Sequence, residues 1–252
     1  MSNHFKKYAL LLIAGVVICS VSCKKDSKEG GGDNPDPKPD TGFVIEAKNV
    51  IVLNGGSDDD VVTVKAHVWN QQLENYNPIA TGKYENGKFK ITLPYTLDNK
   101  YLYAIGNEDF PEGVNVSDRN AKVGEADYFT AYDEDDNKVG RFIYCDEPND
   151  SWDYIVVCYV YADRNLTITG TYTEVYGNTT EITTFDYSLK KGWNIAYKIE
   201  KSDDNCSYFT GTTKKPSDVT LNWCYYEGSW YKTSAATLRD RHFGKILNIT
   251  KY

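Results

Sequence analysis

Histidine is almost absent from this chain, which holds three in 252 residues. His67 falls on the polar face of a predicted strand, and His242 lies in a basic segment. Serine and cysteine nucleophiles need a histidine beside them, and the sequence has no GxSxG, HExxH or glycine-rich phosphate-loop motif. We therefore predict that the protein is not an enzyme and uses no cofactor. A catalytic pair of carboxylates, as in glycosidases, is not excluded by the sequence, because the two residues need to be close in space and not in sequence.

Long hydrophobic runs are also missing. The longest covers residues 9–18, which is shorter than the roughly 20 residues that a membrane-spanning helix needs. Two lysines precede this run, and the small residue Ser22 precedes Cys23, as in an export signal. The pattern predicts a lipoprotein signal peptide over 1–22 and lipid attachment at Cys23, although Ser20 stands where such signals usually have leucine. The lipid would hold the chain on the outer membrane, exposed at the cell surface or facing the periplasm.

The sequence has no block of basic residues. It carries 28 Lys and Arg against 36 Asp and Glu, a net charge of −8. Loss of residues 1–22 would remove two lysines and no acid, which leaves 26 basic residues against 36 acidic ones, or −10. A chain of this charge repels phosphate backbones and anionic headgroups, so we predict no nucleic-acid partner and membrane contact through the lipid alone.

Residues 23–41 predict a flexible linker, because glycines and prolines follow the anchor and no apolar side chain after it can be buried. The part predicted to fold, 42–252, then holds four cysteines, which allow three disulfide pairings: Cys145, Cys158, Cys206 and Cys224. Cys158 lies in an apolar run and is predicted to be a buried thiol. No cysteine or histidine spacing fits a metal site, so no metal is predicted.

Threonine, tyrosine and β-branched residues dominate 42–252, and glycine, asparagine and aspartate interrupt them at short intervals. This pattern predicts an all-β protein with two antiparallel β-sandwich lobes, a first over 42–116 and a second over 117–252. A change in composition near Val114–Asp118 sets the boundary. The one helix predicted is a short one over 233–243.

Several strands can be placed by the alternation of apolar and polar residues. Asn86-Gly87 predicts a two-residue hairpin turn, because both residues accept a positive φ, and it precedes three inward-facing residues: Phe89, Ile91 and Leu93. A second hairpin is predicted over 126–145, with its polar tip at 133–137. Residues 154–161 are apolar on both faces, which predicts a central strand covered on both sides.

A further strand pair is predicted around the turn at 190–192. Phe185 and Tyr187 alternate inward before the turn, and Trp193 and Ile195 alternate inward after it. We expect these residues to be core residues of one antiparallel pair.

Two passages carry a resemblance. Residues 79–82 with 84–94 resemble the transthyretin-like, carboxypeptidase-regulatory-like β-sandwiches of surface proteins from the Bacteroidetes, and 160–172 with 189–194 resemble uncharacterised lipoproteins of the same bacteria. Asp26 and Glu29 resemble the acidic signal that sends such lipoproteins to the outer face of the outer membrane. The resemblance implies a β-sandwich fold and a surface location, and it supplies no catalytic residue.

The hairpin tip resembles the start of a calcium loop, with Asp133, Asp135 and Asn137 at alternate positions. Calcium loops need a glycine at position six and a bidentate glutamate at position twelve. Lys138 and Tyr144 stand there instead, so we predict a solvated turn without a metal.

Trp69 is the aromatic residue that alternation turns away from the core, on a face shared with Lys65 and His67. Exposed aromatic rings stack on sugars and anchor protein interfaces, so Trp69 is the predicted ligand-binding residue. In the alternative, Trp69 packs under the loop that contains Tyr76 and Pro78, or between the two lobes.

Together these features predict a non-enzymatic outer-membrane surface lipoprotein that binds a polysaccharide or a cell-surface protein. One alternative is a structural subunit or anchor of a surface fibre, similar to fimbrillins. Another is a lipocalin-like barrel around a small ligand, which requires a closed barrel with an empty centre.

Overall fold

The computed structural model describes residues 42–107, 110–126, 128–146, 153–203 and 205–228, and its elements there are strands and two short 3-10 helices. The first half holds β1 (Phe43–Ala47), β2 (Val50–Val52), β3 (Thr63–Asn70), β4 (Asn75–Glu85), β5 (Lys88–Leu93), η1 (Asn99–Tyr101), β6 (Tyr103–Ala104), η2 (Ile105–Asn107), β7 (Asn115–Val116) and β8 (Lys122–Ala126). The second half holds β9 (Tyr128–Tyr132), β10 (Lys138–Asp146), β11 (Tyr154–Ala162), β12 (Leu166–Tyr176), β13 (Thr179–Leu189), β14 (Gly192–Ser202), β15 (Cys206–Thr212) and β16 (Leu221–Glu227). The predicted all-β class is confirmed. Cys23, the linker and the helix predicted over 233–243 lie outside the described residues.

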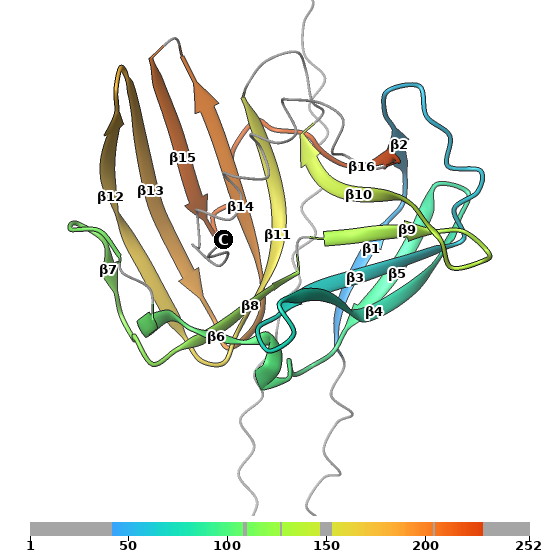
Figure 1. Ribbon diagram of the computed structural model, residues 1–252, viewed down its shortest axis with the longest axis horizontal. Helices are drawn as coiled ribbons and strands as arrows, with labels where there is room; N and C mark the ends of the chain where they lie inside the picture. The colour runs from blue at the N-terminus through green and yellow to red at the C-terminus, as the bar shows by residue number, and fades with distance from the viewer. Residues whose placement is uncertain (1–41, 108–109, 127, 147–152, 204, 229–252) are drawn as a thin grey trace, which may run out of the picture. The chain divides into compact units, whose positions relative to one another are not determined.

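The strands join into one hydrogen-bonded network (Figure 1). Its main path runs β1-β5-β4-β3-β9-β10-β11-β14-β15-β13-β12-β7, while β16 pairs with β10 and β2, and β8 pairs with β11 and β6. Two pairings, β13 with β15 and β16 with β2, are parallel, which the expectation of antiparallel strands did not include. Strand pairing crosses the predicted boundary between 116 and 117, because β3 pairs with β9 and β7 with β12. The division into lobes stays a prediction.

Strand β11 separates the two main parts of the hydrophobic core. Tyr159 and Tyr161 face the first core, which also contains Val64, Phe89, Phe142, Trp223 and Tyr225. Cys158 and Val160 face the second core, which also contains Ile168, Phe185, Tyr187, Leu189 and Phe209. The predicted central strand with two buried faces is therefore confirmed, and so is the buried thiol of Cys158.

Both predicted hairpins are present. Asn86 and Gly87 have φ angles of 51° and 70° and connect β4 to β5, whose inward residues are buried as expected. In the second hairpin the carboxylate of Asp133 accepts hydrogen bonds from the backbone N–H groups of Asp135 and Asn137, at 3.0 and 2.8 Å. The tip is thus closed by its own side chains, which is the usual role of aspartate in turns.

The strand pair predicted around residues 190–192 is wrong in its pairing. β13 and β14 follow each other closely in the chain, but β15 lies between them, parallel to β13 and antiparallel to β14. Phe185 and Tyr187 are buried as predicted, whereas Trp193 is half-buried and Ile195 is 41% exposed. Alternation identified the buried face of β13 but not that of β14, and it could not show that a later strand separates them.

Candidate functional site

Trp69 lies at the end of β3, next to the connection to β4. The two strands are in antiparallel register there, with Trp69 opposite Tyr76 and Asn70 opposite Asn75. Val64, Ala66 and Val68 point into the first core, so strand alternation turns Trp69 to the other face, as predicted.

Trp69 packs on Tyr76 in an edge-to-face contact, with ring centroids 5.1 Å apart and planes at 77°. Trp69 is half-buried, while Tyr76 keeps 41% of its surface exposed and the neighbouring Leu73 keeps 64%. The contact between Trp69 and Tyr76 that was predicted as the alternative is therefore present. Tyr76 and Pro78, however, belong to strand β4 and not to a loop. The pair forms a small aromatic surface at the end of the β3–β4 hairpin.

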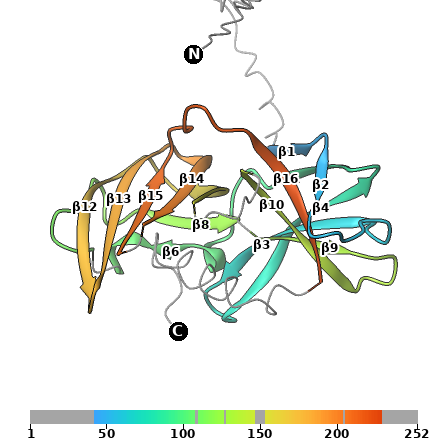
Figure 2. The ribbon, with the colours of Figure 1, turned by 90° about the horizontal axis from the view of Figure 1, so that it is seen from above.

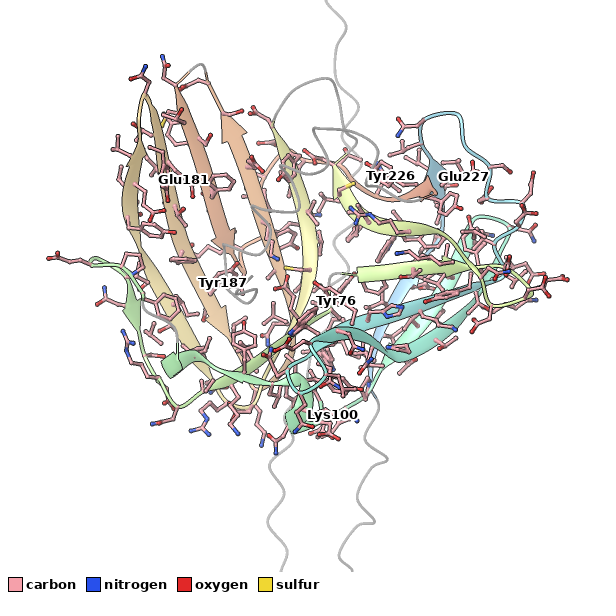
Figure 3. All side chains as sticks on the ribbon, in the orientation of Figure 1. Tyr76, Lys100, Glu181, Tyr187, Tyr226 and Glu227 are labelled. Atoms are coloured by element: carbon pink, nitrogen blue, oxygen red, sulfur yellow. The ribbon has the colours of Figure 1, made fainter. Side chains whose placement is uncertain are left out.

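Amide side chains hold this end of the hairpin. Asn70 Nδ2 donates to Asn77 Oδ1 at 2.8 Å, and Asn70 Oδ1 accepts from the backbone N–H groups of Gln72 and Leu73. The backbone N–H of Gln71 donates to the carbonyl of Lys100 at 3.0 Å, which ties the hairpin to η1. In Figure 3, Tyr76 and Lys100 accordingly lie in the same region of the molecule. These bonds fix the backbone that carries the aromatic pair.

The Gln71 side chain adds an amide donor beside this surface. Its Nε2 atom is buried and has no hydrogen-bond partner within the described part of the chain. A buried donor without a partner is uncommon in folded proteins.

His67 lies two residues before Trp69 on the same face of β3. Its ring stacks on Tyr132 at 6.4 Å between centroids, and its Nε2 atom is 3.5 Å from the Tyr132 hydroxyl. Burial, with smaller contributions from the positive charges of Lys138 and Lys65, lowers the pKa of His67 to about 4. The histidine is therefore neutral at pH 7. Although it lies on the face that alternation makes polar, it is only 6% exposed.

The second core contains a buried ion pair that was not predicted from the sequence. Lys198 Nζ lies 2.5 Å from Glu125 Oε1, and the two side chains are 3% and 9% exposed. The hydroxyl of Tyr187 is close enough for both charges to act on it, and burial raises its pKa well above the ordinary value.

No signal in the sequence distinguishes this pair. Lys198 alternates with apolar residues of β14, as a lysine on a solvated strand face would, and Glu125 lies in a short strand between small residues. Both faces of β14 are partly covered, so the alternation that normally separates core from solvent does not apply to Lys198.

The described residues offer no other chemical centre. No group of three or more metal-ligating side chains occurs among them, and none of their helices is long and apolar enough to cross a membrane. In the hairpin tip predicted to bind no calcium, Asp133 bonds to its own turn and Asp136 pairs with Lys65. The Trp69–Tyr76 surface is thus the best candidate for a binding site.

Comparisons of the chain with protein-family models, with curated proteins and with solved structures found no match.

Proposed function

We propose that this protein is a non-enzymatic lipoprotein, anchored by Cys23 at the outer face of the outer membrane, that binds a glycan through Trp69 and Tyr76. The signal pattern before Cys23 supports the location. The observation that supports the binding role most directly is the edge-to-face pair of Trp69 with a Tyr76 ring that stays 41% exposed.

A partly exposed aromatic pair suits carbohydrate chemistry. The C–H faces of a sugar ring pack on an aromatic ring, while sugar hydroxyls both donate and accept hydrogen bonds. The bonds that Asn70 makes with Asn77 and with the turn hold the backbone under the pair in place, which lowers the entropic cost of ordering the two rings on binding.

The test is a glycan array probed with the full chain purified in detergent, followed by titration of the glycans that bind. Trp69→Ala should weaken binding by about 1–3 kcal/mol, the range for loss of a well-placed aromatic anchor, and Trp69→Phe should retain part of it. Tyr208→Ala is the matched control, because Tyr208 is 39% exposed on β15, outside this hairpin.

Thermal melts of the same variants separate loss of binding from loss of folding. If the wild-type chain binds no glycan, or if Trp69→Ala binds as tightly as Tyr208→Ala, the proposal is wrong.

A further inference from the structure

Strands β12, β13, β15 and β14 stand side by side, as Figures 1 and 2 both show, and one face of them lines the second core. The described residues cover this face at one end. The partly buried apolar residues that reach it from other elements lie within 103–116, and Phe110 among them packs edge-to-face on Phe185 at 6.1 Å. β7 pairs with β12 beside Ile168. In Figure 1, β6 and β7 accordingly run past the end of β13 that contains Leu189.

The opposite end of this face is buried as well. Alternation along β13 puts Thr183 and Glu181 on the same face as Phe185, and Phe209 of β15 lies beside Thr183 in register. Glu181 is 6% exposed, Thr183 is 2% exposed and Phe209 is 3% exposed. Figure 3 shows Glu181 toward the other end of β13 from Tyr187. A sheet face that is turned to water leaves its side chains exposed, so a further segment must cover this end.

The charges at this end are acidic. Glu174 of β12 lies directly opposite Glu181, and the register puts Glu200 of β14 on the same face. We call these three glutamates the acidic face. Lys198 is paired with Glu125, so that pair adds no net charge. Like charges opposite each other destabilise a sheet, and burial of a carboxylate is costly without positive charge nearby. The segment that covers the acidic face is therefore expected to be basic.

Charge distinguishes the segments that lie outside the described residues. Residues 229–252 contain five basic residues and one acid, Asp240, which gives a net charge of +4. Their basic residues are Lys232, Arg239, Arg241, Lys245 and Lys251. Residues 23–41, which follow the predicted signal peptide, contain four lysines and five acids, a net charge of −1. The shorter stretches contain no lysine or arginine: 108–109, 127, 147–152 and 204. The C-terminal segment is thus the one whose charge complements the acidic face.

The C-terminal segment is also long enough to reach this face. It follows Gly228, whose backbone N–H donates to the carbonyl of Val139 at the end of β16. In the hydrogen-bonded order β16-β10-β11-β14-β15-β13, β13 lies five strands from β16, or about 24 Å at the usual strand spacing. The 24 residues of the segment span up to about 80 Å when extended. They include apolar side chains that can cover Phe209, such as Phe243 and Ile246.

We propose that the C-terminal segment, residues 229–252, covers the acidic face of its own chain, and that Arg239 and Arg241 bring positive charge to Glu181 and Glu200. Arginine suits this position, because its guanidinium group binds two carboxylate oxygens at once and is more weakly hydrated than the ammonium group of lysine. The segment thereby completes the cover of the second core. The proposal is independent of the glycan site, which lies at the β3–β4 hairpin.

The test is limited trypsin digestion of the full chain in detergent. Mass spectrometry follows cleavage after Arg241, relative to cleavage after Lys28 in the predicted linker. The wild-type segment should be protected, and the double variant Glu181→Gln/Glu200→Gln should be cut after Arg241 about ten times faster, because cleavage follows the population of the released segment. Asp186→Asn is the matched control, since Asp186 lies on the opposite face of β13 and pairs with Lys214 at 2.8 Å. If melting curves show that the double variant is unfolded, Glu200→Gln alone takes its place.

A second measurement tests the contact directly. A carbodiimide joins a carboxylate to a lysine amine that lies against it, forming an amide while the reagent takes up the water. Peptides that contain Glu174 or Glu200 should become linked to Lys232, Lys245 or Lys251 of the same chain. In a mixture of unlabelled and nitrogen-15-labelled chains, links between the two kinds would assign the cover to a second copy and overturn the proposal. Equal cleavage after Arg241 in the wild-type chain and the glutamine variants overturns it as well.

Discussion

The hydroxyl of Tyr187 lies directly against the backbone of Gly211. A Cβ atom added to Gly211 would stand 2.2 Å from the Tyr187 oxygen, although Cβ contacts under 3.0 Å essentially never occur. The ring belongs to β13 and crosses over β15, which is possible because residue 211 has no side chain. Since the surrounding core is tightly packed, we expect Gly211→Ala to destabilise the fold by about 1–3 kcal/mol, measured by chemical denaturation. An unchanged midpoint would contradict this packing.

Tyr187→Phe should behave differently. Among the described residues the Tyr187 hydroxyl has no hydrogen-bond partner, so its removal should leave stability unchanged or raise it by up to about 1 kcal/mol. Tyr84→Phe is the matched control, because the buried Tyr84 hydroxyl donates to the Asp58 carboxylate. Loss of that charge-assisted bond should cost about 1.5–3 kcal/mol. Equal losses in the two variants would show that Tyr187 has a bonding partner.

Because Lys198 and Glu125 form a buried ion pair, we expect substitutions of the two residues to have strongly non-additive effects on the free energy of unfolding. Lys198→Met alone leaves a buried carboxylate without its cation and should cost about 3–5 kcal/mol. Adding Glu125→Leu removes the second charge and should recover most of that loss. Denaturant titrations of the two single variants and the double variant measure the coupling, and simple additivity would refute it.

His67 should make stability depend on pH. Its pKa of about 4 in the fold lies below the ordinary value of 6.5, so the unfolded chain binds a proton more readily than the folded one. The stabilisation is complete above pH 6.5 and is lost as the pH falls toward 4, by up to about 3 kcal/mol. The His67→Gln variant cannot take up this proton, so its free energy of unfolding should change less between these pH values than that of the wild-type chain. Parallel curves for the two chains would contradict the assignment.

The proposed lipid on Cys23 can be tested by detergent phase partitioning. We expect the wild-type chain in the detergent phase and the membrane fraction, and Cys23→Ser in the aqueous phase, because the variant has no thiol for the lipid. Cys206→Ser should partition like the wild type. Membrane retention of Cys23→Ser would show that something other than the lipid holds the chain.

Local chemistry made part of the fold predictable. The turn at Asn86-Gly87 could be predicted because few other dipeptides accept two positive φ angles, and the buried faces of β5 and β13 followed from strict alternation. The same rule placed Trp69 on the face opposite the first core. These features depend on residues close together in the chain.

Features that depend on distant residues were not predictable in this way. Nothing near residue 190 shows that residues 206–212 separate β13 from β14. Nothing near Lys198 identifies Glu125, and the contact of Trp69 with Tyr76 depends on the register between β3 and β4. The candidate site was therefore predicted as Trp69 with Tyr76 named only as a packing alternative, and the register that places the two rings opposite each other came from the structure.

The position of β15 has a consequence for the order in which the chain folds. β13 and β14 are joined by a short connection that Asn194 holds through hydrogen bonds to Lys190 and Gly192, yet each strand pairs with β15 and not with the other. The native sheet therefore needs a segment made later to enter between two strands that are close in sequence, and such non-local pairing slows folding. Until residues 206–212 arrive, both strands expose open edges, and an emerging or truncated chain is prone to aggregate at this point.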